Sequence, residues 1–441
     1  MKQVWRACTA LLLGVLLLWN SGCGFPAFFA EEFFAAPRGS GEQEGLLQAL
    51  EAYLAQATGQ DQPEYRLKYP QEGADLTAFV FLDADGAAAC DAAVFYTCPA
   101  QSARARLLYL HKQDGVWAGV CDLEGRSETV RSALPRDLDG DGVAELLVGW
   151  DLYNARDGYL TVYSIAPQNG AAACRALYET LYTSLLTADM DGQAGEELLL
   201  LHILHTEHHV SARLAGCRKG ELREWGGVRL DGSIIRFTGF QAAVLADGTH
   251  AVFADGVKDG GSLLTELIVW NGETLSAPLY HADSNQTTLT VRESGLPSAD
   301  VDHDGVPEWP VSQRLPGYES CEPAQALYQT TYYQWDGGTA SARPVLTALV
   351  NGADGYMIVL GNDLRGRVTA AYDPARRLYE VRRAEDGAAL LRVICAADGA
   401  IPPDYLRLMT RGTAQYGFWV PADGDRLISE EQARYMITFL S

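Results

Sequence analysis

A short acidic segment recurs along the sequence at nearly constant intervals. Two copies are complete: Asp137–Glu145 reads DLDGDGVAE, and Asp300–Glu308 reads DVDHDGVPE. Weaker copies begin at Asp83, Asp189 and Leu245, so that the five starts are separated by 54, 52, 56 and 55 residues. A repeat of this length predicts a fold built from successive copies of one small supersecondary unit.

A second feature follows the same interval. It is a two-residue turn between two apolar or aromatic stretches, and Asn-Gly and Asp-Gly pairs at such places permit the positive φ angles of a hairpin. The five turns are Asp114-Gly115, Asn169-Gly170, Lys219-Gly220, Asn271-Gly272 and Asp336-Gly337. The pattern therefore predicts that each unit contains, in this order, an acidic loop, a strand, a longer connection, a hairpin, and a final strand that leads into the next loop.

The unit has the size of a propeller blade, which places about four strands in about 50 residues. In the second unit the candidate strands are 145–150, 159–165, 174–181 and 184–188. We therefore predict a mainly β fold, a β-propeller of about five blades over residues 75–352. The strand-like run 76–82 is expected to close the ring by completing the last blade.

The two complete loops carry carboxylates at positions 1, 3, 5 and 9. Alternate Asp side chains on a tight, Gly-containing loop can converge on one point, and a main-chain carbonyl can add another oxygen. Hard divalent cations bind several oxygens at once, so calcium is the natural occupant. The spacing differs from that of the EF-hand, in which the closing Glu stands further along a loop between two helices.

The loops and the strands after them resemble the FG-GAP or VCBS-type repeats of integrin alpha-chain propellers and of many bacterial surface proteins. The resemblance covers about residues 75 to 345 and is specific at the two complete loops. It implies calcium ligands from the loop carboxylates and from one main-chain carbonyl in each loop. These ligands are Asp137, Asp139, Asp141, the Val143 carbonyl and Glu145, and Asp300, Asp302, Asp304, the Val306 carbonyl and Glu308.

The other copies depart from the pattern to different degrees. Asp189, Asp191 and Glu197 keep three acids and are expected to form a third metal site, although position 5 is neutral and the turn Gly at position 6 is replaced by Ala. The copy at Asp83 has Ala at position 5, and the copy at Leu245 keeps one acid and is not expected to bind metal. The alternative for every copy is an acidic turn exposed to solvent.

Residues 1–22 predict an export signal. Basic residues precede the apolar run Ala10–Trp19, which is too short to span a membrane as a helix. Ser21 and Gly22 before Cys23 resemble a bacterial lipoprotein signal, in which Cys23 becomes the lipidated first residue. Asn20 stands where such signals usually have Leu, so cleavage by ordinary signal peptidase or retention as an anchor are the alternatives. We expect an extracytoplasmic chain that is lipid-anchored at the cell membrane.

Three further segments flank the repeats. Residues 23–42 are a predicted tether whose five Phe residues either contact the membrane interface, belong to a linker, or are buried on the propeller. Residues 43–60 predict an amphipathic helix, because apolar residues recur at helical spacing. Residues 355–441 predict a small, separately folded α+β domain with short strands and a final helix that starts with a capping box at Ser429.

The net charge, the cysteines and the histidines limit the classes of partner and metal site that the chain could have. The chain has 57 acidic and 34 basic residues, which disfavours nucleic acid as a partner. The cysteines lack zinc-type spacing, and most are expected to be buried apolar residues of undecided pairing, although Cys90 and Cys98 could form a bridge across one strand. Histidines between His202 and His209 could bind zinc or copper, but a solvated turn is favoured, because His202 and His205 point to opposite faces of a strand.

The sequence lacks a nucleophile elbow, a phosphate loop and a metalloprotease helix. We therefore expect a non-catalytic, membrane-anchored, calcium-binding module that binds a protein or glycan at the cell surface. The alternative is an extracellular carbohydrate-active enzyme, a lyase or hydrolase with catalytic groups on loops of several blades. A third hypothesis is a spacer that holds the C-terminal domain at a fixed distance from the membrane.

Overall fold

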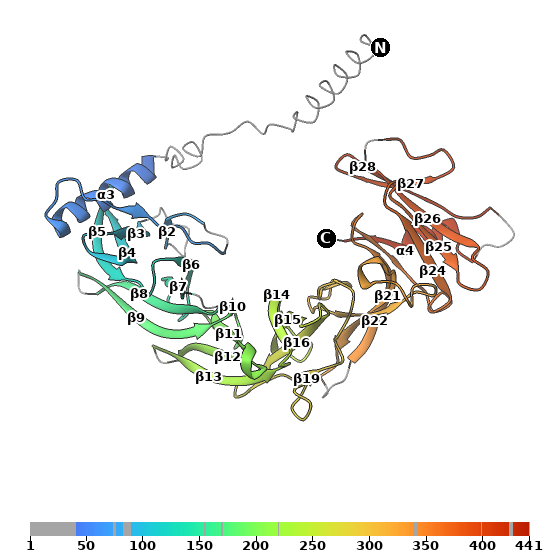
Figure 1. Ribbon diagram of the computed structural model, residues 1–441, viewed down its shortest axis with the longest axis horizontal. Helices are drawn as coiled ribbons and strands as arrows, with labels where there is room; N and C mark the ends of the chain where they lie inside the picture. Colours follow the sequence, from blue (N-terminus) through green and yellow to red (C-terminus); the bar gives the residue numbers. More distant parts are fainter. Residues whose placement is uncertain are drawn as a thin grey trace, which may run out of the picture.

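The computed structural model describes residues 41–440, apart from 74–75, 83–89, 154–155, 169–170, 219, 338–341, 398 and 423–426. The chain has a mainly β, propeller-like fold, in which antiparallel sheets follow one another along an open arc (Figure 1). The predicted mainly β, propeller-like fold class is therefore confirmed. The predicted export signal, the tether up to residue 40 and Cys23 lie outside the described residues.

The described chain begins with one helix, which is followed by the thirteen strands of the first three sheets. Helix α3 (Gly41–Thr58) packs on the first sheet. The strands of the first sheet are β1 (Arg66–Leu67), β2 (Phe79–Phe81), β3 (Asp91–Cys98), β4 (Ser102–Gln113) and β5 (Val116–Glu124). Those of the second are β6 (Val130–Arg136), β7 (Glu145–Asp151), β8 (Gly158–Gln168) and β9 (Ala171–Tyr182). Those of the third are β10 (Ser184–Ala188), β11 (Glu197–Leu204), β12 (His209–Arg218) and β13 (Glu221–Leu230).

Three larger sheets and one small one follow. The fourth sheet contains β14 (Ile234–Val244), β15 (His250–Lys258), β16 (Leu263–Trp270) and β17 (Leu275–Ser276), after which β18 (Tyr280–His281) pairs with β19 (Gln286–Thr287). The fifth contains β20 (Trp309–Arg314), β21 (Tyr328–Trp335), β22 (Ala342–Asn351), β23 (Tyr356–Val359) and β29 (Ile437–Phe439). The sixth contains β24 (Val368–Asp373), β25 (Leu378–Arg383), β26 (Ala389–Ala396), β27 (Leu406–Arg411) and β28 (Ala414–Trp419). Helix α4 (Glu430–Met436) and the 3-10 turns η1 (His205–Glu207) and η2 (Pro323–Gln325) complete the described elements.

The position of the acidic loop within each repeat explains how the strands are divided between successive sheets. In the second and third sheets the acidic loop joins the first strand to the second, and the four strands predicted in the second unit are present as β7, β8, β9 and β10. The last of them, β10, starts the third sheet rather than ending the second. Asp114 and Gly115 have φ angles of 51° and 82° between β4 and β5, as the predicted hairpin requires.

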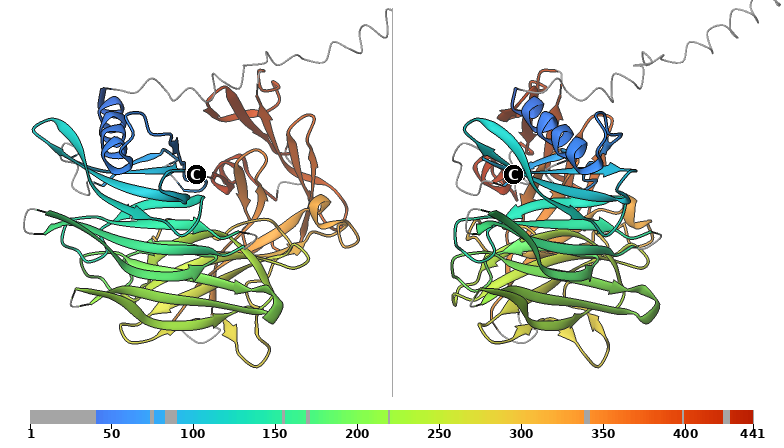
Figure 2. Two further views of the ribbon diagram at one scale, coloured as in Figure 1. Left: turned by 60° about the vertical axis from the view of Figure 1, so that its left-hand side comes forward. Right: turned by 90° about the vertical axis from the view of Figure 1, so that its left-hand side faces the viewer.

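The core lies between neighbouring sheets, which Figure 2 shows lying one on the next. Strand β7 illustrates the packing: Leu146, Val148 and Trp150 face the first sheet, whereas Leu147 faces the third. Successive side chains of a strand point to opposite faces, so a strand between two sheets is apolar on both sides. This arrangement accounts for the unbroken apolar run after the Asp137–Glu145 loop.

The structure corrects the predicted ring closure. Strand β2 (79–81) pairs with β3 in the first sheet and does not complete the last blade. The free edge of β22 is instead taken by β23, which follows it after a short turn, and β29 then adds to β23. Local pairing after a short connection involves a smaller loss of chain entropy than pairing with β2, which ends at residue 81, about 260 residues before β22 begins at residue 342. The first and sixth sheets accordingly lie at the two ends of the arc (Figure 1).

The predicted boundary between residues 352 and 355 runs through a continuous sheet. Strand β22 before the boundary pairs with β23 after it, and one apolar cluster joins Leu315 and Leu349 of the fifth sheet to Val381 and Phe418 of the sixth. The capping box at the start of α4 is present, with Gln432 N donating to Ser429 Oγ at 3.1 Å. The described residues between 355 and 440 thus form a β-rich extension of the repeat array with one short helix.

The predicted amphipathic helix is confirmed as α3. Leu46, Leu50 and Leu54 are buried against a cluster that includes Leu108 and Trp117 of the first sheet. Gly59, with a φ of 69°, follows its last turn. Within the described part of the chain, no helix has both the length and the apolarity needed to cross a membrane.

A buried ion pair holds the long connection between the fourth and fifth sheets. Arg292 lies 2.8 Å from Asp255 of β15, and the two side chains are 0% and 3% exposed. The second Asp255 oxygen accepts hydrogen bonds from the backbone N and the hydroxyl of Ser298, at 2.8 and 3.0 Å. The network therefore fixes the segment that leads into the Asp300–Glu308 loop.

We expect Asp255→Ala to destabilise the protein by about 3–5 kcal/mol, because it leaves the buried Arg292 guanidinium without its counter-charge. Urea unfolding followed by tryptophan fluorescence measures the change. The matched control is Asp259→Ala, since Asp259 is exposed at the end of the same strand. Equal unfolding midpoints for the two variants would show that the ion pair contributes nothing measurable.

Candidate metal centres and a neighbouring pocket

Three acidic loops bring carboxylate oxygens together. In each loop, one oxygen from each of three side chains lies within 4.8 Å of the other two. The groups are Asp137, Asp139 and Glu145; Asp189, Asp191 and Glu197; and Asp300, Asp302 and Asp304. All nine of these acids are among the eleven predicted as metal ligands, and the two predicted acids outside the groups are Asp141 and Glu308.

The backbone of the Asp137–Glu145 loop explains this convergence. Both oxygens of Asp137 accept hydrogen bonds from the loop itself, from Gly140 N at 2.7 Å and Gly142 N at 2.9 Å. The two glycines have φ angles of 74° and 86°, which side-chain-bearing residues rarely adopt. Asp139 in turn accepts from Asp141 N at 3.2 Å. The loop thus turns tightly around its own carboxylates, as the spacing of Asp and Gly predicts.

The closing glutamates share one position. Glu145 accepts from Leu138 N at 3.0 Å, and Glu197 and Glu308 make the equivalent bonds to the second residue of their loops at 2.8 and 2.9 Å. All three are buried, with exposures of 5%, 4% and 0%. Burial first, and then repulsion from the loop aspartates, raises the pKa of each to about 7. Carboxylates held in this way gain most from a bound cation.

We expect the stability of the chelated protein to fall as the pH rises from about 4.5 to 7. Each closing glutamate binds its proton more tightly in the folded chain, so in this window the native state holds more protons than the unfolded state. The loss is up to about 2 kcal/mol for each group after solvent screening. Melting temperatures measured against pH test this, and Glu145→Gln should flatten the slope.

A control for the pH effect lies in the fourth sheet. Glu266 is fully buried, accepts from Asp231 N at 2.7 Å, and its pKa is also raised to about 7 by burial. Because Glu266 lies outside the acidic loops, added calcium should leave its contribution to the slope unchanged, and Glu266→Gln should remove it. A slope that is the same in both Gln variants and in the unaltered protein would assign the pH dependence to other groups.

The Asp300–Glu308 loop differs from the other two in one respect. Gln334 of β21 donates its amide to Asp304 at 2.8 Å and to Glu308 at 2.9 Å, and Arg343 donates to the Gln334 oxygen. Glu308 is accordingly absent from the group of converging oxygens, which here contains Asp304 instead. The sequence analysis missed Gln334, because nothing in its local pattern links β21 to the loop before β20.

Asp141 also lies outside the converging group of its loop, where its side chain accepts from Val143 N at 2.8 Å. Val306 N makes the equivalent bond to Asp304 at 2.9 Å. The structure thus places both valines inside their loops, next to the fifth-position acids. A ligand role for the Val143 and Val306 carbonyls stays a prediction of the resemblance.

The Asp189–Glu197 loop contacts its neighbours on both sides. Glu196 N donates to the Asp137 carbonyl at 3.0 Å, which joins this loop to the one in the second sheet. On the other side, His250 Nδ1 lies 2.8 Å from the Asp189 carbonyl and 3.8 Å from its carboxylate. His250 belongs to the copy at Leu245, whose one acid, Asp247, accepts from Thr249 N in a plain turn. The corresponding loops of the second, third and fourth sheets therefore contact one another in order.

The histidines near η1 have separate partners. His202 lies 3.5 Å from Asp157, His205 contacts Arg156 at 3.2 Å, and a third histidine, His209, contacts an arginine of β13 at 2.9 Å. Among the described residues, these imidazoles do not gather into a metal-binding group. The favoured prediction of a polar turn agrees with this placement.

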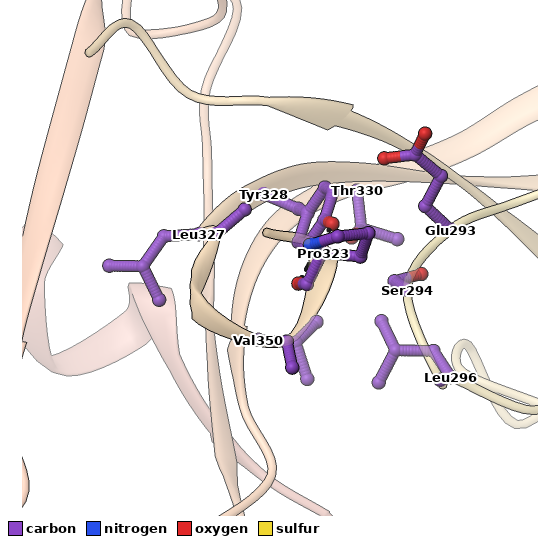
Figure 3. A pocket seen from close by; sticks show the side chains of 11 residues that line it. Glu293, Ser294, Leu296, Pro323, Leu327, Tyr328, Thr330 and Val350 are labelled. Atoms are coloured by element: carbon purple, nitrogen blue, oxygen red, sulfur yellow. Dashed lines mark hydrogen bonds between the residues drawn. The ribbon is translucent and has the colours of Figure 1, made fainter. Parts of the chain in front are cut away.

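A pocket of about 440 Å³ lies where the 293–296 segment, η2 and strands β21 and β22 meet (Figure 3). Its lining is mixed: Leu296 and Val350 are apolar, whereas Glu293 provides a carboxylate. One Glu293 oxygen pairs with Arg314 at 2.8 Å. Ser294 is nearly buried and bonds to Ser312 at 2.7 Å. The pocket can accept a small ligand or a side chain of a partner that combines apolar surface with hydrogen-bond donors.

Two further pockets have similar composition. One, of about 480 Å³, lies between α3 and the β4–β5 hairpin and contains Glu42 and Lys112. The other, of about 320 Å³, lies beside α4 and contains Asp363. Each of the three described pockets therefore has one carboxylate in its lining. Glycoside hydrolysis generally requires two carboxylates on opposite sides of the bond that is cleaved.

Comparison with known proteins gives only distant similarities. No family model and no curated protein matches the sequence. Among solved structures, a rhamnogalacturonan lyase from Bacillus licheniformis matches with a TM-score of 0.29 and 13% identity over 74% of each chain. Sqt1 from Chaetomium thermophilum matches with a TM-score of 0.28 and 14% identity, over 72% of this chain and 78% of Sqt1. Sqt1 from Saccharomyces cerevisiae has a TM-score of 0.27 and 12% identity, over 74% and 82%.

Proposed function

We propose that this chain is a calcium-binding, propeller-like module that binds a protein or glycan at the cell surface and does not catalyse a reaction. The observation that carries the metal assignment is the shared geometry of three acidic loops. In each, carboxylate oxygens converge, and a buried glutamate accepts from the second backbone N–H of its loop. Oxygen donors alone fit calcium or magnesium better than zinc or copper.

Calcium is favoured over magnesium because it tolerates irregular coordination geometry. Calcium accepts six to eight oxygens in variable geometry, whereas magnesium requires a near-regular octahedron and retains several waters. The Asp137, Asp139 and Glu145 carboxylates would hold the ion in the first loop, with Asp141 and the Val143 carbonyl completing the set. When bound, the ion neutralises charge that the loop otherwise keeps at close range.

The loops also explain why metal binding would matter for a binding module. The Asp189–Glu197 loop contacts the Asp137 loop through Glu196 N, so an ordered loop in one sheet supports the loop in the next. Ordering of adjacent loops would fix neighbouring sheets relative to each other. A rigid array presents its pockets and connecting loops with little entropy loss on binding a partner.

Calorimetric titration of chelated protein tests the metal assignment. We expect about two strong calcium sites and a weaker one where Gln193 replaces the fifth-position acid. Asp139→Ala should remove one site, whereas Asp247→Ala should remove none, because Asp247 lies in a plain turn. Absence of binding heat at millimolar calcium would mean that the loops are solvated acidic turns.

The carbohydrate-active enzyme remains the alternative to test, and the single carboxylate in each described pocket favours binding over hydrolysis. Incubation of the calcium-loaded protein with a panel of acidic and neutral polysaccharides should release neither reducing ends nor unsaturated products. Product formation that is lost in Glu293→Gln would instead assign an enzyme site to the pocket of Figure 3.

We propose that Cys23 anchors the module to the membrane. Ser21-Gly22-Cys23 is the motif that supports this step. The wild-type chain should partition into the detergent phase, and Cys23→Ala should move it to the aqueous phase or leave its signal uncleaved, because the acylated residue is absent. Release of wild-type protein into the medium without lipid would favour cleavage by ordinary signal peptidase.

A further inference from the structure

Two cysteines meet where the first and second sheets pack. Cys121 lies on β5 and Cys174 on β9, the last strands of these sheets. Both are partly buried against the same apolar cluster, which contains Phe95, Trp150 and Tyr163. Strands β5 and β9 contact each other, and each of the two thiols shifts the pKa of the other. This pair could not be identified from sequence patterns, because 52 residues lie between the two cysteines.

The pairing considered from sequence is excluded by the fold. Cys90 directly precedes β3, a strand of eight residues, and Cys98 is its last residue. At about 3.3 Å per residue their Cα atoms are about 26 Å apart, whereas a disulfide needs about 4.4–6.8 Å. Cys217 and Cys395 belong to the third and sixth sheets. Cys121 and Cys174 are therefore the pair that the arrangement of sheets favours.

We propose that Cys121 and Cys174 form an intrachain disulfide that joins the first two sheets when the exported chain meets an oxidising compartment. The oxidant is a disulfide, either a small-molecule disulfide or the active-site disulfide of an exported oxidoreductase. The Cys121 thiolate attacks one of its sulfurs and releases the first thiol, which leaves a mixed disulfide. The Cys174 thiolate then attacks the Cys121 sulfur and releases the second thiol. Two protein thiols are oxidised, and one external disulfide is reduced.

The surroundings suit this reaction. A hydrogen bond from Cys174 lowers the pKa of the Cys121 thiol below its usual range, which makes Cys121 the attacking group. The same contact between sheets holds Arg126, which pairs with Glu179 and lies 5.4 Å from the Tyr159 ring. These interactions keep β5 and β9 in place before the bond forms. The chain segment that the disulfide would enclose includes the whole Asp137–Glu145 loop. The proposed disulfide does not depend on bound calcium.

Thiol mapping of the full-length protein in mixed reduced and oxidised glutathione tests the proposal. After the free thiols are alkylated, we expect peptide mass spectrometry to find Cys121 linked to Cys174, with two fewer alkylated thiols per chain than in dithiothreitol. Oxidation should raise the melting temperature by roughly 3–5 °C, because it restricts the unfolded chain. Dithiothreitol should reverse the shift.

Matched variants separate this pair from the other cysteines. Cys121→Ser and Cys174→Ser should each abolish the linked peptide and the melting shift, whereas Cys90→Ser and Cys217→Ser should keep both. If either pair variant fails to fold, the mapping of the wild-type chain still decides. Two free thiols at Cys121 and Cys174 in the oxidised wild type, linkage of either to another cysteine, or a melting shift that persists in Cys174→Ser would each overturn the proposal.

Discussion

Addition of calcium to chelated protein should raise its melting temperature by several degrees at neutral pH. A ligand that binds only the folded chain stabilises it by RT ln(1 + [L]/Kd), which is about 2.7 kcal/mol for one site at a hundred times Kd. The buried glutamates add to the effect, since the ion favours the charged form of Glu145 and Glu308, whose pKa values are raised to about 7 by burial first and then by repulsion from the loop aspartates. Differential scanning calorimetry with and without calcium measures the shift.

Variants assign the shift to particular loops. Asp139→Ala and Asp302→Ala should each remove part of it, and the double variant should remove most of it. Asp247→Ala is the matched control, because Asp247 occupies the same loop position as Asp139 and Asp302 without neighbouring acids. A calcium shift that survives in the double variant would place the binding sites elsewhere.

The two complete loops should not respond equally. In the Asp300 loop the Gln334 amide already donates to Asp304 and Glu308, so calcium must displace these hydrogen bonds before it gains those ligands. Among the described residues, Glu145 accepts from Leu138 N, and no side-chain amide donates to it as Gln334 donates to Glu308. Two loops with carboxylates at the same positions can therefore differ in calcium affinity through a contact from another strand.

The sequence predicted the strands well where the repeat and its turns mark them. The acidic loops and the Asn-Gly or Asp-Gly pairs fix both ends of a strand, and the four predicted strands of the second unit agree with β7 to β10 within a few residues. The convergence of carboxylates follows equally from local spacing, because Asp137 bonds to glycines three and five residues later. Short-range sequence patterns were therefore sufficient to predict both the limits of these strands and the convergence of the carboxylates.

Features that depend on distant contacts were not predictable in this way. Ring closure by β2 was wrong, because the edge of β22 is filled by β23 and β29, and a sequence pattern does not show which edge is free. Gln334, His250 and the Cys121–Cys174 pair were missed for the same reason. Each of them acts on a residue in another sheet or loop, and no short-range periodicity records that contact.

Removal of residues 353–441 should prevent the remaining chain from reaching a stable fold. The truncation deletes β23 and β29 from the fifth sheet and exposes Leu315 and Leu349, which are 2% and 0% exposed in the whole chain. Loss of that burial costs on the order of 4 kcal/mol for the two leucines, before the unpaired edge of β22 is considered. This is a large part of the stability of a typical domain.

A point substitution tests the same contact between β23 and the rest of the fifth sheet without deleting residues 353–441. Ile358 is fully buried and pairs with Leu349 on one side and Ile437 on the other, so Ile358→Ala should cost about 2–5 kcal/mol. Tyr435→Ala is the control, because Tyr435 is 78% exposed on α4 and its removal should change stability by less than about 0.5 kcal/mol. Chemical unfolding should show one cooperative transition for the fifth and sixth sheets together. If the truncated chain instead melts like the whole protein, the tail is an independent domain, as the sequence alone indicated.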